Sequence, residues 1–235
     1  MLDKKISFIK RTGIINDYLI ICDHSSNKIP PEYNNLCISK KIINSHRAFD
    51  IGASEVASEL SNLLECNLVM ANFSRLLIDP NRGYDDPTLI PKISEGEIIK
   101  GNLNISLLKN DKERNKRINN FYQPYHDQIS KFINIAFSEN KIPKILSIHS
   151  FTPIWKGKKR ETDIGILWDK DDRLSEIFIS SFNNSNIGNN KPYSGRLKND
   201  TLYRHATMRG LPHVLIDLRQ DLLKKKKDRL QWAKK

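Results

Sequence analysis

The stretch YLIICDHSSN, residues 18–27, runs from apolar side chains directly into a cluster of polar ones. Two later segments have the same form, ILSIHSFT at residues 145–152 and HVLIDLRQD at residues 213–221. The apolar part of each is short and unbroken, which is typical of a strand that is covered on both faces. We therefore predict three buried strands, Tyr18–Cys22, Ile145–Ile148 and His213–Leu218, in a parallel or mixed sheet.

Between these strands the chain contains weaker apolar runs and stretches with helical periodicity, which predict further strands and helices. We expect further strands at Leu68–Met70 with Leu76–Ile78, and at Ile164–Trp168. Apolar residues at helical spacing predict the helices 53–64, 114–133 and 172–182, with Asp50 placed to cap the first and Pro124 to kink or restart the second. Residues 183–190 and 80–101 are expected to be loops. Helices that alternate with buried strands predict one three-layer α/β/α domain over residues 1–235, with a mixed, mostly parallel central sheet.

Composition excludes several classes of protein. Of the 235 residues 38% are hydrophobic, which is too many for a disordered chain, and apolar residues nowhere run long enough to cross a membrane. Cys22, Cys37 and Cys66 cannot all pair and form no CxxC motif, so we expect reduced thiols and, with no signal-like opening, a cytoplasmic protein.

The chain is strongly basic, with 39 Lys and Arg against 27 Asp and Glu and a net charge of +12. Such a charge attracts nucleic acid, anionic membranes or small anions. The lysine clusters at 224–227 and 234–235 are typical of solvated surface, and no aromatic repeat or zinc-finger spacing accompanies them. We therefore favour a small anionic ligand over nucleic acid.

Polar groups at the strand ends suggest a metal site. His24 and His149 follow the first two strands, and Asp217 lies near the end of the third. In open α/β sheets ligands bind beyond the carboxyl ends of the strands, and imidazole with carboxylate suits Zn²⁺. Each residue also has a simpler explanation: a hydrogen-bonded loop histidine, a helix cap for Asp50, or an ion pair with Arg219 for Asp217.

Seven short motifs occur in order along nearly the whole chain. They are CDHSSNKIP (22–30), HRAFDIGA (46–53), SRLLIDPNR (74–82), PYH (124–126), LSIHSFTP (146–153), PYSG (192–195) and GLPHVLIDLRQDL (210–222). With these motifs the chain resembles the N-formylglutamate amidohydrolase family, whose fold is related to that of the zinc carboxypeptidases. The resemblance implies a zinc hydrolase that cleaves N-formyl-L-glutamate, or a similar N-acyl amino acid, and releases formate and L-glutamate.

The resemblance also implies roles for the strand-end residues. His24 and His149 would be zinc ligands. Carboxypeptidases have a Glu three residues after the first His, where this chain has Asn27, so Asp50 is our candidate for the third ligand. Asp217 occupies the place of the general base, where the family often has Glu.

A substrate with two carboxylates calls for guanidinium groups. Arg75, Arg82 and Arg219 lie in the shared motifs and are the predicted carboxylate ligands, with Asn27, Tyr193 and Ser194 as further substrate contacts. Two alternatives stay open: a hydrolase of larger γ-glutamyl or peptide-like amides, and a non-catalytic basic binding protein with the same fold. The oligomeric state is not predicted.

Overall fold

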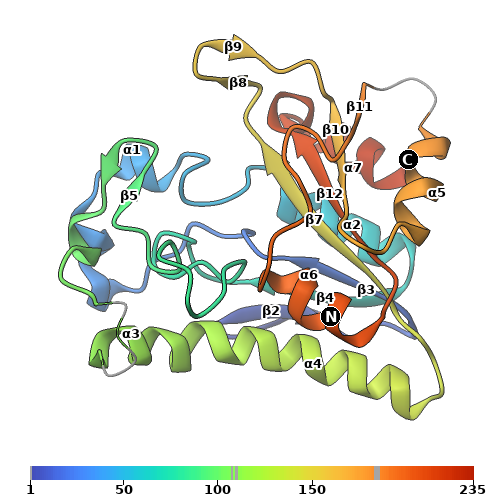
Figure 1. The fold of residues 1–235 in the computed structure, drawn as a ribbon, viewed down its shortest axis with the longest axis horizontal. Coiled ribbons are helices and arrows are strands. Elements are labelled where there is room, and N and C mark those ends of the chain that lie inside the picture. Colours follow the sequence, from blue (N-terminus) through green and yellow to red (C-terminus); the bar gives the residue numbers. More distant parts are fainter. Residues whose placement is uncertain (1, 107, 109–110, 183–185) are drawn as a thin grey trace.

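A mixed sheet forms the centre of the protein. The computed structural model describes residues 2–106, 108, 111–182 and 186–235. Within these residues eight strands hydrogen-bond in the order β1-β2-β4-β3-β7-β12-β10-β11 (Figure 1). The central strands β4, β3, β7 and β12 are parallel to one another, β2 and β10 join them antiparallel, and β11 runs parallel to β10. The strands are β1 (Leu2–Lys4), β2 (Phe8–Arg11), β3 (Ile15–Cys22), β4 (Cys66–Ala71), β7 (Lys144–Phe151), β10 (Ile164–Leu167), β11 (Ile187–Asn189) and β12 (His213–Arg219).

Helices cover both faces of the sheet, as the unbroken apolar strands predict. Alternate residues of β3 pack into two separate clusters, Leu19 and Ile21 into one, Ile20 and Cys22 into the other. Helix α4 (Gln123–Ser138) and α6 (Thr201–His205) contribute to the first cluster. Helices α2 (Ala53–Leu63), α5 (Arg173–Ser181) and α7 (Lys226–Lys234) contribute to the second. Figure 1 shows α4 on one side of the sheet and α2 and α7 on the other, which confirms the three-layer α/β/α fold.

The long apolar stripe that begins at Arg114 is three helical segments in succession. Helix α3 (Lys112–Arg117) passes into a π-helical turn (Ile118–Tyr122), and α4 then begins with Pro124 in its first turn. The π-helical turn, in which the Gln123 N–H donates to the Ile118 carbonyl, leads directly into this proline, which is tolerated in the first turn of a helical segment. Pro124 therefore starts a new helix, one of the two outcomes predicted for it.

Short elements occupy the connections. They are the helix α1 (Lys40–Ile43), the hairpins β5 (Ile93–Ser94) with β6 (Glu97–Ile98) and β8 (Ile154–Trp155) with β9 (Lys158–Lys159), and the 3₁₀ turns Pro31–Cys37, Lys100–Asn102, Thr207–Arg209 and Gln220–Leu223. The β5–β6 hairpin follows the segment that contains Arg75 and Arg82, and the β8–β9 hairpin follows the strand that contains His149.

The structure corrects several local predictions. Leu76–Ile78 is a turn, and its residues are apolar because they pack in the core rather than because they form a strand. Residues 187–189 of the predicted loop form β11, whereas residues 183–185 of that loop lie outside the described residues. Asp50 does not cap α2, since the N-cap is Gly52 in a left-handed conformation (φ +84°).

Cys22 and Cys66 are buried and Cys37 is exposed, and all three are free thiols, as predicted. Among the described residues, every helix is too short or too polar to span a bilayer.

Candidate metal centre

Parallel strands bring the predicted ligands to one edge of the sheet. His24 follows β3, and His149 lies near the end of the adjacent β7. Asp217 on β12 is directly opposite His149 in the strand register. The third predicted ligand, Asp50, comes from the segment before α2, where its backbone N–H donates to the carbonyl of His24 at 2.8 Å. Four chain segments therefore converge where the sequence predicted.

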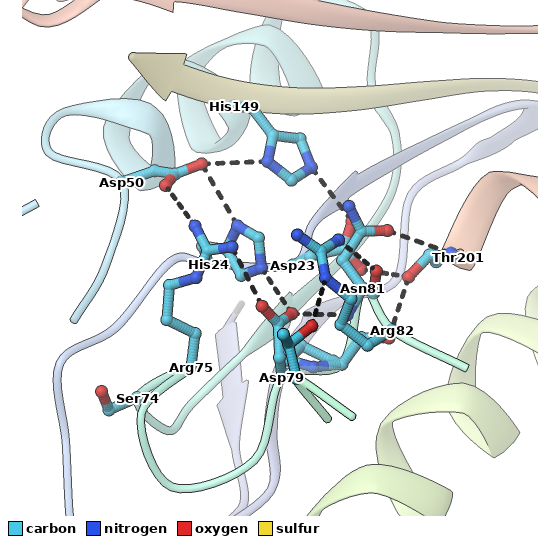
Figure 2. Close-up of polar contacts among 12 residues, drawn as sticks. Asp23, His24, Asp50, Ser74, Arg75, Asp79, Asn81, Arg82, His149 and Thr201 are labelled. Atoms are coloured by element: carbon cyan, nitrogen blue, oxygen red, sulfur yellow. Dashed lines mark hydrogen bonds and ion pairs between the residues drawn. The ribbon is translucent and has the colours of Figure 1, made fainter. Parts of the chain in front are cut away.

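The two imidazoles and Asp50 form a compact, buried group (Figure 2). The rings of His24 and His149 lie 4.9 Å apart, centroid to centroid, and are nearly perpendicular. Nδ1 of His149 is 2.9 Å from Oδ2 of Asp50, and Nδ1 of His24 is 3.4 Å from the same oxygen. One ligand atom from each residue lies within 4.8 Å of the others.

A second carboxylate lies behind each ring. Nε2 of His24 is 2.8 Å from Oδ1 of Asp79, and Nε2 of His149 is 3.1 Å from Oδ2 of Asp23. The outer nitrogen of each imidazole is thus bound to a buried acceptor, and the inner Nδ1 is directed toward Asp50. This arrangement fixes ring orientation and is typical of histidines that bind metals.

The two outer carboxylates are themselves held by further hydrogen bonds. Asp23 accepts from the Tyr125 hydroxyl at 2.9 Å and from the Thr201 hydroxyl at 2.6 Å. Asp79 accepts from the backbone N–H of Asn81 at 2.9 Å and from Nη2 of Arg75 at 2.9 Å (Figure 2). Side chains from α4, α6 and the loop after β4 therefore stabilise the rings indirectly.

In this cluster the neighbouring charges stabilise the ionised carboxylates and a protonated His149, although all of these side chains are buried. Burial alone disfavours ionisation, but His24 and His149 outweigh it and hold the pKa of Asp50 well below the usual range. The same balance lowers the pKa of Asp23 to about 2. At Asp79 the groups that outweigh burial and lower the pKa are His24 and two arginines, Arg75 and Arg82. Burial also opposes a charged His149, yet its hydrogen bonds with Asp23 and Asp50 raise its pKa to about 10.

These residues fit a divalent metal. Nδ1 of His24 is buried, lies 3.4 Å from Oδ2 of Asp50 and makes no hydrogen bond among the described residues, so this nitrogen is available to bind an ion in the group. Two imidazole nitrogens and one carboxylate are a ligand set that zinc enzymes use, with a further position open to water or substrate. His24, His149 and Asp50 are the residues that could hold the ion.

Asp217 lies beside this group in the same cavity. Its side chain is buried, and Oδ1 has no hydrogen-bond partner among the residues described. Burial is the main cause that raises the pKa of Asp217 to about 7. A carboxyl group with a pKa near neutrality can both accept and return a proton.

Comparison with known proteins now identifies the family. The sequence model of the N-formylglutamate amidohydrolases matches residues 16–224. The chain belongs to this family. A gene product of Agrobacterium tumefaciens with a known structure is 32% identical, with 98% of this chain and 91% of that one covered and a TM-score of 0.90. A comparison with curated proteins gave no significant match.

The fold also agrees with a more distant structure. The N-formylglutamate amidohydrolase from Ralstonia eutropha JMP134 shares 17% identity with this chain, with 97% of this chain and 96% of that one covered and a TM-score of 0.57. At that identity the likeness concerns the fold alone.

Most of the predicted site residues of this family member line one cavity of about 520 Å³. The predicted residues among its lining are His24, Asp50, Arg75, Arg82, His149, Tyr193, Ser194 and Asp217. The cavity lies over the carboxyl ends of the parallel strands.

Two predicted substrate-binding residues lie elsewhere. The amide of Asn27 donates to the Asn44 side chain at 2.9 Å and to the Ile43 carbonyl at 3.2 Å, and Asn27 does not line the cavity. Arg219 forms ion pairs with Asp163 at 2.9 Å and with Asp221 at 2.7 Å, also outside the cavity. Since both side chains are engaged in local structure, we do not retain them as substrate ligands.

Sequence reasoning missed the residues that support the ligands. Asp23 directly precedes His24, and Asp79 lies within the family motif at 74–82, so each had a signal in a stretch already singled out. Asp200 was also missed: it is buried at the cavity, caps α6 by accepting from the Tyr203 N–H at 2.7 Å, and burial raises its pKa to about 7. Tyr125 lies in the motif at 124–126, whereas Thr201 lies in none of the motifs and is brought to Asp23 only by the fold.

Proposed function

We propose that this protein is a metal-dependent amidohydrolase that cleaves N-formyl-L-glutamate, or a similar N-acyl amino acid, to L-glutamate and the free acid. The observation that supports this most directly is the convergence of two Nδ1 atoms on one oxygen of Asp50, with a buried carboxylate behind each ring. A non-catalytic binding protein on this fold has no need to keep such a ligand set.

His24, His149 and Asp50 would hold the metal, for which we propose Zn²⁺. When bound, such an ion polarises the amide carbonyl and lowers the pKa of water toward about 7. Asp217 takes the proton from the attacking water and passes it to the leaving amine, because its free Oδ1 and its pKa of about 7 suit both transfers.

Arg82 is the better of the two remaining candidates for a substrate carboxylate. Arg75 is already engaged, since its guanidinium lies 2.9 Å from Asp79 and 3.6 Å from Asp50. Arg82 lines the same cavity, and its ion pair with Asp86 is long, at 3.9 Å. Its other contacts are with uncharged groups, since it donates to the Thr88 hydroxyl at 3.2 Å and to the Asn81 carbonyl at 2.9 Å. We therefore assign Arg82 to the substrate and Arg75 mainly to positioning Asp79, with Tyr193 and Ser194 at the cavity rim.

Formate release from a set of N-formyl amino acids tests this function. The purified protein should contain zinc and should hydrolyse N-formyl-L-glutamate faster than N-formyl-L-leucine. Arg82→Ala should raise KM for N-formyl-L-glutamate by about tenfold or more, because one charge-assisted pair is lost, and should spare the neutral substrate. Zinc-loaded protein that hydrolyses neither these amides nor any other N-acyl amino acid would refute the proposal.

A further inference from the structure

One side of the cavity is an aromatic wall, made of Phe151, Trp155 and Tyr193, around the guanidinium of Arg160. The carbon Cζ of Arg160 lies 5.3 Å from the ring centroid of Phe151, 5.4 Å from that of Trp155 and 4.7 Å from that of Tyr193. All three distances are within the range of cation–π attraction. One cation therefore holds together rings from β7, from the β8–β9 hairpin and from the loop after β11.

Arg160 serves this wall rather than a salt bridge. Its Nη2 donates to the Tyr193 hydroxyl at 2.7 Å, and its backbone N–H donates to the Pro153 carbonyl at 2.8 Å. Within the described part of the chain it forms no ion pair, and its Nη1 is buried without a hydrogen bond. The arginine thus fixes the rings in place from behind.

The wall presents apolar surface to the cavity. All three rings line it; Trp155 is 40% exposed and Tyr193 is 44% exposed. Leu197, also a lining residue, is 45% exposed and extends the same side. Rigid aromatic surface at the mouth of a cavity is typical of a binding site for an apolar group.

The cavity is larger than N-formyl-L-glutamate requires. Its volume of about 520 Å³ lies in the range of pockets for drug-sized ligands. N-formyl-L-glutamate has only about a dozen non-hydrogen atoms, well below that size class. A formyl group adds a single carbon to the amide, so it leaves the space in front of the aromatic wall unfilled.

Charge is distributed unevenly across the cavity. Arg75 and Arg82 follow β4, on one side of the metal ligands on β3 and β7. The wall begins at Phe151, the last residue of β7, and extends to Tyr193, which follows β11 at the edge of the sheet farther from β4. An amide bound at the ligands with a carboxylate toward Arg82 has room for its acyl group on the side of the rings.

We propose that the aromatic wall is an acyl subsite, and that the preferred substrates are N-acyl-L-glutamates whose acyl group is apolar and larger than formyl. This inference rests on the proposed function and adds the class of acyl group. N-benzoyl-L-glutamate is a suitable probe, because its phenyl ring can stack on Trp155 while its two carboxylates remain the same as in the formyl substrate.

Glutamate release from N-formyl- and N-benzoyl-L-glutamate tests the subsite. The wild-type protein should have the higher kcat/KM for the benzoyl substrate. Trp155→Ala should lower that value by at least about tenfold and change the formyl value by less than about twofold, since only the larger group contacts the wall. Trp155→Phe should restore most of the benzoyl activity. Ile154→Ala is the matched control, because Ile154 is the exposed neighbour in the same hairpin and does not line the cavity.

Calorimetric binding of N-benzoyl-L-glutamate to zinc-loaded Asp217→Asn protein, with and without Trp155→Ala, separates the two proposals. Tighter binding that depends on Trp155, without hydrolysis of either amide by the protein with Asp217 intact, would support the subsite and refute the hydrolase. If the protein hydrolyses N-formyl-L-glutamate but binds N-benzoyl-L-glutamate equally well with and without Trp155→Ala, the acyl subsite is refuted and the hydrolase is not. If Trp155→Ala lowers kcat/KM only for N-formyl-L-glutamyl-L-phenylalanine, the acyl subsite is also refuted. The wall would then bind a residue attached to the carboxyl side of glutamate.

Discussion

Two pairs of buried histidines within the described residues have opposite surroundings. His24 and His149 each have a carboxylate at the outer nitrogen, and their inner nitrogens converge on Asp50. His126 and His205 instead bond to each other, with Nδ1 of the first 2.8 Å from Nε2 of the second, and their rings are stacked. The outer atoms of this second pair meet the Pro80 carbonyl at 3.1 Å and the Ser130 hydroxyl at 3.4 Å.

The different surroundings determine whether the histidines are protonated. Burial lowers the pKa of His126 and His205, in the second case to about 3, and nearby Arg204 acts in the same direction. In the first pair, carboxylates outweigh burial and raise the pKa of His149 to about 10. Burial alone yields neutral, structural histidines. A candidate metal site requires acceptors behind the rings that leave one nitrogen of each directed inward.

The two pairs should differ most when one histidine of each is replaced by alanine. His149→Ala should abolish stoichiometric zinc binding and formate release, because a ligand is lost. His205→Ala should retain zinc but lose about 3 kcal/mol of unfolding free energy, through a cavity and unsatisfied polar neighbours. Metal analysis after dialysis and urea unfolding measure the two effects. Zinc retained at full stoichiometry in His149→Ala would remove the distinction between the pairs.

Asp217 is the residue expected to transfer protons beside the first pair, because it lines the same cavity and is opposite His149 in the strand register. Asp217→Asn should keep zinc and lower kcat by on the order of a hundredfold or more, because an amide cannot accept the proton. Asp200→Asn is the matched control, a second buried acid at the cavity, and a smaller loss is expected there. Equal losses in both variants would mean that the assignment of the base to Asp217 is incorrect.

The carboxylates behind the rings should have an intermediate effect. Asp79→Asn and Asp23→Asn keep the shape of the acceptor but remove its charge, so each should weaken zinc binding by about 10- to 100-fold without abolishing it. Competition with a chromophoric chelator gives the affinities. Unchanged affinity in both variants would show that the carboxylates behind the rings are not what separates the two pairs.

The sequence indicates that the candidate site residues lie close together, but it does not indicate which residues support them, and the reason is physical. His24, His149 and Asp217 end apolar runs, and parallel strands bring such ends together. Thr201 contacts Asp23 across 178 positions of sequence, a proximity that no local pattern records. Arg219 lies in a shared motif, yet its charge is used by Asp163 and Asp221, which the motif cannot show.

Strands outside the centre of the sheet were missed for a similar reason. Strand β2, FIKR at residues 8–11, is only partly buried and mixes polar with apolar residues, so it lacks the unbroken apolar run that identifies central strands. Its position is set by pairing with β4, which is a property of the assembled sheet.

The smallest expected effect is a pH dependence that belongs to the second pair alone. The pKa of His205 is about 3 in the folded protein and about 6.5 in an unfolded chain. As pH falls below about 6.5 the unfolded chain takes up a proton that the folded protein does not, so stability that is fully present above this pH is lost toward pH 3. The slope from one such group is at most about 1.4 kcal/mol per pH unit.

His205→Gln should flatten this slope, because glutamine offers a donor and an acceptor but does not titrate there. Urea unfolding of metal-free protein at pH 7.5, 6 and 5 measures it, and the carboxylate cluster around His24 and His149 titrates alike in both proteins, so its contribution cancels in the difference. Arg204 and Arg209 lower the pKa of His205 and Asp23 raises it, and none of these is replaced. The substitution removes one cause of the low pKa of His126, but burial, the largest cause, remains. If the variant loses stability with falling pH as steeply as the wild type, the second pair is not held neutral by burial, and the contrast between the two pairs is then one of geometry only.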